Sequence, residues 1–189
     1  MNDLHVGPVR SGDWDHLARL FGDNGAYANC WCMWWRLRAA DFDRGVKERG
    51  AGNRSAMRAL VDDDRVPGLI AWRDGDPVGW VSVAPRTEFP RVERSPVLQP
   101  VDSEQAWAVV CFYIPRSERG RGVATALLDA AVAYVSGRGG RLLEGYPSPA
   151  GDRRAPDLYT GTESMFARAG FTEVARRRPT SRSIWRKRL

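Results

Sequence analysis

The hydrophobic pattern of the chain changes its period around residue 120. Before this point, Val109–Ile114 is a continuous apolar run of β-branched and aromatic residues, which is typical of a buried strand. Pro115 ends the run because proline has no backbone N–H to donate to a sheet. From Gly122 onwards the apolar residues follow a helical spacing, at Val123, Leu127, Ala130, Ala131 and Tyr134. The pattern therefore predicts a strand, a polar loop and a helix in succession.

Strand and helix patterns also alternate through the rest of the chain. The predicted strands are Leu4–Val9, Gly68–Trp72, Pro77–Ala84, a strand from Arg141 that closes at Pro147, Phe171–Arg177 and Ser183–Lys187. The predicted helices are one with Trp14, Leu17, Ala18 and Phe21 on a single face, Lys47–Val61 and Glu163–Ala169. Two long polar loops are expected at Pro85–Ser103 and Ser148–Gly161. We expect a single domain over residues 1–189, because the length suits one core and no linker divides it.

The predicted loop contains two glycines, Gly120 and Gly122. Glycine tolerates backbone conformations closed to other residues, and it has no Cβ to keep a ligand away. The helix that follows begins with unpaired N–H groups and with the positive end of its dipole. Together these features predict an anion site that suits a phosphate or a pyrophosphate.

The spacing of the loop residues separates the known kinds of phosphate loop. A Walker loop ends in Gly-Lys followed by Ser or Thr, which is absent here. A dinucleotide fold requires a third glycine, and Thr125 stands at that position. Arg119–Ala124, RGRGVA, instead resembles the Q/R-x-x-G-x-G/A signature of the GCN5-related N-acetyltransferases, the GNAT family. Ser164–Phe171, SMFARAGF, resembles the helix and Gly-Phe ending of the same family.

This resemblance implies a fold and an acyl donor. The expected fold class is α/β, a GNAT fold whose mixed, mostly antiparallel central sheet is flanked by helices. The expected donor is acetyl-CoA, with its pyrophosphate on the loop amides and its thioester carbonyl on a backbone N–H of the central strand. No metal is expected. The residues expected at the cofactor are Phe112, Tyr113, Ile114, Arg119, Gly120, Arg121, Gly122, Val123 and Ala124.

Acetyl transfer to an amine needs a group that accepts the amine proton. Glu144 is the first candidate, because its segment LLEGYP resembles the Leu-Glu-Val strand of the ribosomal-protein alanine acetyltransferases, in which the glutamate is the base. The alternatives are Glu88 in the long loop, a chain of water molecules, or a structural Glu144 paired with an arginine.

The leaving thiolate must also be neutralised. The family resemblance places a tyrosine acid three or four residues before the closing Gly-Phe, but Phe166 stands there and has no proton to give. Tyr159 is the preferred replacement, because the preceding loop could return it to the site. Tyr146 and water are the alternatives.

The segment Tyr27–Arg36, YANCWCMWWR, is rich in tryptophan. Aromatic side chains bind flat or cationic ligands well, so this segment is a candidate wall of the acceptor pocket. Core packing between the first helices is the alternative interpretation. The residues expected at the acceptor are Trp31, Trp34, Trp35, Glu88 and Tyr146.

The charge of the chain is concentrated near its C-terminus. Composition is otherwise ordinary for a globular domain, with 43% hydrophobic and 28% charged residues. The formal net charge of +6 is accounted for by the arginine-rich segment Thr172–Leu189. Such a segment can mark a nucleic-acid surface. Its apolar residues alternate with the arginines as in terminal strands, so we expect solvated strand arginines and no nucleic-acid partner.

Cys30, Cys32 and Cys111 are an odd number of cysteines in a chain without a secretion signal, which favours reduced thiols in the cytoplasm. A metal site at Cys30 and Cys32 would need His5 or His16, which lie in another predicted element. No apolar run approaches about 18 residues, so no membrane association is expected.

Three functions fit these features. The first is a cytoplasmic, acetyl-CoA-dependent N-acetyltransferase that acts on a primary amine of a small molecule, such as an antibiotic or a metabolite. The second is the same chemistry on a protein or peptide amine, which needs an open groove. The third is a non-catalytic acyl-CoA-binding module that works through its basic C-terminal segment. The acceptor is left open by the sequence, and so is a homodimer.

Overall fold

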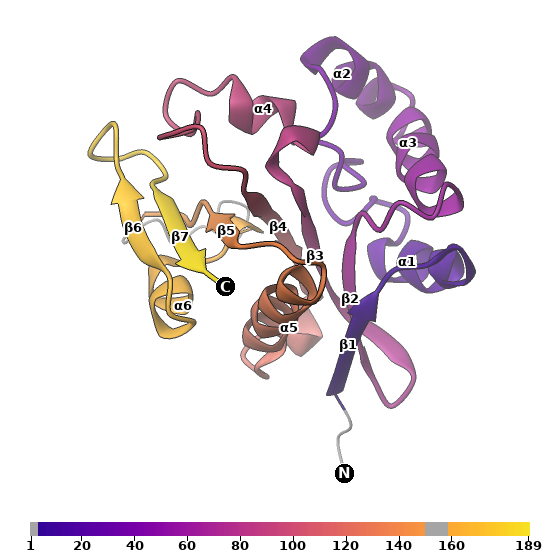
Figure 1. The fold of residues 1–189 in the computed structure, drawn as a ribbon. Coiled ribbons are helices and arrows are strands. Elements are labelled where there is room, and N and C mark those ends of the chain that lie inside the picture. The colour runs from indigo at the N-terminus through magenta and orange to yellow at the C-terminus, as the bar shows by residue number, and fades with distance from the viewer. Residues whose placement is uncertain (1–3, 150–158) are drawn as a thin grey trace.

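The computed structural model of the chain describes residues 4–149 and 159–189. Figure 1 shows helices packed around a central twisted sheet. The elements are β1 (Leu4–Pro8), η1 (Ser11–Asp13), α1 (Trp14–Phe21), α2 (Ala39–Lys47), α3 (Ala51–Asp62), β2 (Gly68–Arg73), β3 (Asp76–Pro85), η2 (Arg86–Glu88), α4 (Pro90–Glu93), β4 (Trp107–Tyr113), η3 (Arg116–Glu118), α5 (Val123–Gly137), β5 (Leu142–Gly145), α6 (Glu163–Arg168), β6 (Thr172–Ala175) and β7 (Ile184–Arg188). The predicted loop Ser148–Gly161 lies partly outside the described residues.

The described strands form one seven-stranded sheet in the order β1-β2-β3-β4-β5-β7-β6. Neighbouring strands are antiparallel, except that β4 and β5 run parallel. β2 and β3 form the predicted hairpin, with Arg73 opposite Asp76 across the Asp-Gly turn. This mixed, mostly antiparallel sheet with helices on its faces confirms the predicted fold class.

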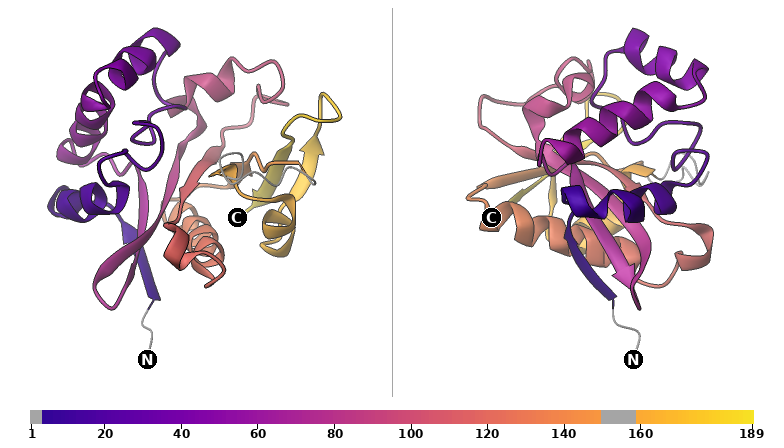
Figure 2. Two further views of the ribbon diagram at one scale, coloured as in Figure 1. Left: turned by 180° about the vertical axis from the view of Figure 1, so that it is seen from behind. Right: turned by 90° about the vertical axis from the view of Figure 1, so that its right-hand side faces the viewer.

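Alternation along the strands sends side chains into separate cores on the two faces. Val81 and Val83 of β3 pack with Leu127 of α5 on one face. Trp80 of the same strand packs with Leu17 of α1 on the other face, on the side of α1, α2 and α3 (Figure 2). Gly79 brings α5 close to the sheet, because a Cβ there would lie 2.5 Å from Val123 and 3.0 Å from Leu127.

β4 and β5 separate part of the way along their length. They pair from Trp107 with Leu143 to Val109 with Gly145, where β5 ends, whereas β4 continues to Tyr113. The ring of Phe166 in α6 packs against Gly145, where a Cβ would lie only 2.0 Å from the ring. These contacts leave one edge of β4 without a strand partner in the half that follows Val109.

The second predicted helix, Lys47–Val61, is wrong in its bounds. The structure has two helices here, α2 and α3, separated by Gly50 in a left-handed conformation with φ +84°. They cross closely at Gly45, where a Cβ would lie 2.4 Å from the side chain of Asn53. The Asn53 amide donates a hydrogen bond to the carbonyl of Asn29, which fixes the helix pair to the preceding segment.

Candidate active site

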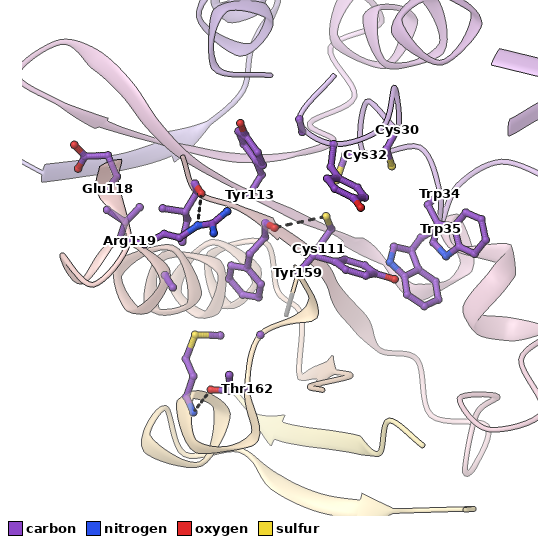
Figure 3. Close-up of a pocket in the computed structure, with 18 of the residues that line it drawn as sticks. Cys30, Cys32, Trp34, Trp35, Cys111, Tyr113, Glu118, Arg119, Tyr159 and Thr162 are labelled. Carbon is purple, nitrogen blue, oxygen red and sulfur yellow. Dashed lines mark hydrogen bonds between the residues drawn. The ribbon is translucent and has the colours of Figure 1, made fainter. Parts of the chain in front are cut away.

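A cavity of about 870 Å³ lies where the free half of β4, the loop before α5, residues 26–46 and Tyr159 meet. Figure 3 shows that side chains from these separate segments face one space. Glycines and backbone form one half of its wall, and aromatic and thiol side chains form the other half.

The glycine loop closes one end of the cavity. Gly120 and Gly122 have φ values of +74° and +81°, which glycine adopts without strain. A Cβ at either position would meet no protein atom within 4 Å, so the backbone conformation, not packing, selects glycine. α5 begins directly afterwards at Val123, so the unpaired amides of its first turn and its positive dipole end lie at the cavity wall. This arrangement suits an anion.

Polar contacts fix the loop in place. Glu118, whose side chain is 14% exposed, accepts hydrogen bonds from Arg73 at 3.1 Å and from Arg121 at 2.7 Å. Arg119 donates from Nε to the carbonyl of Ile114 at 3.1 Å. Arg121 is therefore turned to Glu118 and is not part of the cavity wall. The other residues predicted at the cofactor do line the cavity: Phe112, Tyr113, Ile114, Arg119, Gly120, Gly122, Val123 and Ala124.

The free half of β4 forms the long side of the cavity. A β-bulge falls at Val110, because Ser82 of β3 pairs with Cys111 and Val83 pairs with Val109. Phe112 lies just beyond the bulge, 6.4 Å from the ring of Phe166. Strand backbone without a neighbouring strand leaves N–H and C=O groups available to a ligand.

Aromatic side chains form the opposite half. Trp34, Trp35, Phe42 and Tyr159 line it, and the rings of Trp35 and Tyr159 lie 6.5 Å apart. Asp43 lines the same half, is exposed, and has no ion pair within the described residues. Sequence reasoning missed Phe42 and Asp43 because it did not predict α2, the helix that carries them.

The sequence of residues 31–160 matches the model of the Acetyltransferase (GNAT) family. The chain belongs to the GNAT family. The predicted recognition is confirmed, and the chain is an N-acetyltransferase with acetyl-CoA as its donor. No curated protein sequence matches this GNAT protein.

Solved structures share the fold of this GNAT protein at low sequence identity. The PaiA N-acetyltransferase from Thermoplasma acidophilum, in complex with coenzyme A, has 11% identity and a TM-score of 0.55 over 99% of each chain. Diaminobutyrate acetyltransferase EctA from Paenibacillus lautus has 14% identity and a TM-score of 0.54 over 98% of this chain and 95% of its own. Agmatine N-acetyltransferase has 13% identity and a TM-score of 0.53 over 100% of each chain.

Tyr159 is the predicted acid that reaches the cavity of this GNAT protein. Burial raises the pKa of Tyr159 to about 12. The guanidinium of Arg182 lies 5.2 Å from the centre of its ring. The phenol is therefore protonated at neutral pH and can donate a hydrogen bond into the cavity.

All three cysteines line the cavity, a role that sequence reasoning missed. Burial, together with Cys32, raises the pKa of Cys30 to about 11. A hydrogen bond to Cys32 and burial raise the pKa of Cys111 well above its usual value. Burial opposes the ionisation of Cys32, but hydrogen bonds from Cys111 and Trp80 outweigh it and lower the pKa of Cys32. Trp80 Nε1 lies 3.0 Å from the Cys32 sulfur.

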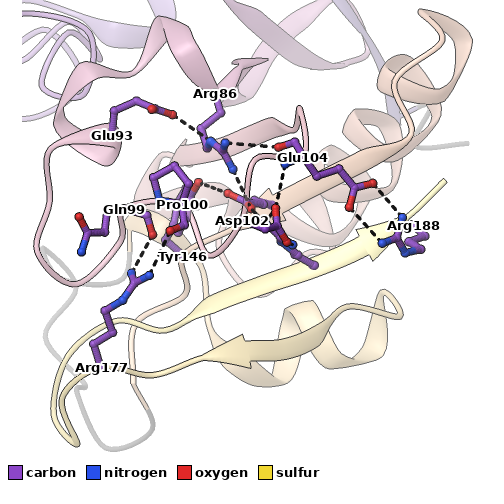
Figure 4. Close-up of polar contacts among 11 residues, drawn as sticks. Arg86, Glu93, Gln99, Pro100, Asp102, Glu104, Tyr146, Arg177 and Arg188 are labelled. Carbon is purple, nitrogen blue, oxygen red and sulfur yellow. Dashed lines mark hydrogen bonds and ion pairs between the residues drawn. The ribbon is translucent and has the colours of Figure 1, made fainter.

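Glu144 is not among the residues that line the cavity. Its side chain is 0% exposed and accepts hydrogen bonds from Arg86 at 3.1 Å, from Arg186 at 2.8 Å and from Tyr146 at 2.7 Å. Arg86 also bonds Glu93 at 2.9 Å (Figure 4). Glu144 is thus paired with two arginines, which is the contact expected under the alternative to its role as base.

Three of the residues predicted at the acceptor, like the predicted base Glu144, are not part of the cavity wall. Trp31 is 5% exposed and stacks on Trp14 in the core, with ring centres 5.8 Å apart. Glu88 accepts a hydrogen bond from Arg36 at 2.7 Å. Tyr146 is 0% exposed beside Glu144. Trp34 and Trp35 are thus the predicted acceptor residues that the structure brings to the cavity.

Three of the C-terminal arginines, Arg177, Arg186 and Arg188, bind other parts of the protein. Arg186 and Arg188 of β7 bind Asp102 and Glu104 of the loop before β4. Arg177 donates hydrogen bonds to backbone carbonyls of that loop, including Gln99 at 2.7 Å (Figure 4). These arginines join the last strands to the rest of the sheet, in keeping with the expected terminal strands.

Among the described residues, no helix is both long and apolar enough to cross a membrane. The same residues contain no group of three or more His, Cys, Asp and Glu side chains arranged to hold a metal ion.

Proposed function

We propose that this GNAT acetyltransferase transfers the acetyl group of acetyl-CoA to a primary amine of a small molecule. The observation that carries the proposal is one cavity that joins the glycine loop to an aromatic wall with a carboxylate, Asp43, that forms no ion pair within the described part of the chain. About 870 Å³ is within the range of cavities that hold small ligands.

The donor would lie along the first half of this cavity. The pyrophosphate of acetyl-CoA would bind the amides at Gly120, Gly122 and Val123, where the loop and the dipole of α5 favour negative charge. The part of acetyl-CoA between the pyrophosphate and the thioester would run along the free edge of β4. A backbone N–H at Phe112–Ile114 would then hold the thioester oxygen as negative charge develops on it.

The acceptor would enter from the aromatic half. Trp34, Trp35 and Phe42 line this half, and aromatic side chains suit an organic cation. Asp43 would attract the ammonium group of that cation. The fold neighbours that act on agmatine and diaminobutyrate are acetyltransferases of small amines, which supports this acceptor class.

Tyr159 would stabilise the leaving thiolate. Full proton transfer from a phenol with a pKa of about 12 to a thiolate with an ordinary pKa near 8.5 is uphill, so the phenol acts by donating a hydrogen bond. The amine proton would pass to water in the cavity, since Glu144 is enclosed by Arg86, Arg186 and Tyr146. We assign Glu144 a structural role.

A thiol-release assay with acetyl-CoA and a panel of small primary amines tests the function. We expect release of coenzyme A that depends on the amine and yields the N-acetyl product by mass spectrometry. Acetylation of peptides alone would favour the protein-modifying function. Acetyl-CoA binding by calorimetry, without transfer to any amine or peptide, would favour the non-catalytic module.

A further inference from the structure

A second cavity, of about 730 Å³, adjoins the first on its acceptor side. It is formed by α4 and the residues after it, by residues 34–39, and by the turn between β6 and β7. Trp34, Trp35 and Tyr159 line both cavities. The aromatic wall of the active site is therefore also the wall of this second space.

Arginines dominate the charge of the second cavity. Its wall contains four of them, Arg38, Arg91, Arg94 and Arg182, and no acidic residue among the residues that line it. Within the described part of the chain, none of the four forms an ion pair with a carboxylate. By contrast, the buried Arg36 and Arg86 are each paired with a glutamate.

Contacts with the aromatic wall hold two of these arginines. The guanidinium of Arg91 lies 3.7 Å from the centre of the Trp34 ring, and its Nε donates to the carbonyl of Leu37 at 3.2 Å. Arg182 stacks on Tyr159 and donates to Thr160 at 3.2 Å. A stacked guanidinium is held in one orientation while its charge stays available to a ligand.

Two buried donors in this wall lack acceptors. Arg91 Nη2 and the indole Nε1 of Trp35 are both buried without a hydrogen-bond partner in the described structure. Trp35 is only 6% exposed, and buried donors are normally satisfied. An oxyanion, which carries only acceptors, is a ligand that suits such donors.

We propose that the second cavity binds a phosphate group carried by the acceptor whose amine occupies the first cavity. These four guanidinium groups, none of which forms an ion pair within the described residues, exceed what one carboxylate would balance, whereas a phosphate monoester carries close to two negative charges and more acceptor oxygens. The binding of such an anion is inferred from the arginines and the unsatisfied donors of the second cavity itself. That the anion belongs to the acceptor rests on the proposed function.

Calorimetry with phenyl phosphate, inorganic phosphate and benzoate tests the anion site without any turnover. The variants are Arg38→Gln with Arg94→Gln, both exposed side chains, and the control is Arg49→Gln with Arg141→Gln, which removes the same charge elsewhere on the surface. We expect wild type and control to bind phenyl phosphate and the first double variant to bind it at least tenfold more weakly. Equal affinity in all three proteins, or benzoate bound as tightly as phenyl phosphate, would overturn the phosphate site.

Steady-state kinetics then test where the phosphate comes from. A series of ω-aminoalkyl phosphates is compared with neutral alkylamines of the same chain length. One member of the phosphate series should have a KM at least tenfold below its neutral counterpart, and Arg38→Gln with Arg94→Gln should remove that advantage while leaving the neutral amine unchanged. Inorganic phosphate that binds the cavity, with no kinetic preference for phosphate-bearing amines, would assign the site to a free anion and refute the acceptor assignment. If no amine is acetylated, the proposed function fails while the calorimetric result stands.

Discussion

The phenol of Tyr146 donates a hydrogen bond to Oε2 of Glu144 over 2.7 Å, between two side chains that are both fully buried. Arg86 and Arg186 donate to the other oxygen of the same carboxylate. The donors come from the ends of β3 and β5 and from β7, so one carboxylate joins three parts of the sheet where β4 and β5 separate. The negative charge of Glu144 also raises the pKa of Tyr146, after the larger effect of burial.

Glu144→Gln should therefore act on stability. Removing the charge leaves Arg86 and Arg186 with a weaker partner in a buried site, and breaking a buried ion pair costs about 3–5 kcal/mol. Urea unfolding should show this loss, while kcat at low temperature, where the variant is folded, should stay within about threefold of wild type.

The matched control for Glu144 is Glu104→Gln, which removes a carboxylate from an ion pair whose Arg188 side chain is 75% exposed. Its unfolding midpoint should hardly change, because exposed pairs contribute little. A folded Glu144→Gln protein with normal acetyl-CoA affinity and a kcat reduced on the order of 100-fold would instead identify Glu144 as the base.

Gly122→Asp should weaken acetyl-CoA binding at least tenfold, about 1.4 kcal/mol. The φ of +81° disfavours any side chain, and the carboxylate would stand at the amides proposed for the pyrophosphate. Gly137→Asp is the control, since it adds the same side chain into open space at the far end of α5. Calorimetry that finds equal affinity in wild type and Gly122→Asp would remove the cofactor assignment.

Tyr159→Phe should lower kcat by roughly 10- to 100-fold, because a hydrogen bond to a charged sulfur is worth about 1.5–3 kcal/mol. Tyr134→Phe, in α5 against Trp107 and away from the cavity wall, should leave kcat unchanged. The phenol of Tyr159 must be protonated to donate this hydrogen bond. With a pKa of about 12, Tyr159 stays protonated at roughly pH 10, where an ordinary tyrosine is half ionised. A wild-type kcat that falls with an apparent pKa near 10, and a Tyr159→Phe profile without that fall, would contradict the buried environment described for this phenol.

Asp43→Asn should raise KM for cationic amines by roughly fivefold, about 1 kcal/mol, with acetyl-CoA affinity unchanged. The effect should shrink at high salt, because Asp43 is exposed and its attraction is screened. Asp41→Asn removes a charge from the same helix at a residue that pairs with Arg44 and does not line the cavity. Equal KM values for the two variants would show that position 43 does not meet the acceptor.

Sequence reasoning located the donor half of the site because that half is local. Gly120, Gly122 and the start of α5 follow one another in the chain, so their spacing alone predicts the loop that the structure shows. The strand before them is equally local. Its separation from β5 could not be predicted, since it depends on where β5 stops and on Phe166, far away in the sequence.

The acceptor half was harder to predict because burial depends on distant partners. Trp31 and Trp34 lie three positions apart, yet Trp31 stacks on Trp14 in the core whereas Trp34 remains 37% exposed at the cavity. Glu144 likewise has apolar neighbours in sequence, but its partners Arg86 and Arg186 come from segments that only the folded sheet brings together.

The separation of β4 from β5 also decides where in the sheet an unpaired strand edge lies. An unpaired strand edge at the rim of a sheet is a template for pairing with other chains. Here the open edge lies in the interior of the sheet, with β3 on its far side and Phe166 packed between Phe112 and Gly145. The fold thus leaves its unpaired strand edge inside the sheet and away from the rim, where the fully buried ring of Phe166 packs α6 against β4 and β5.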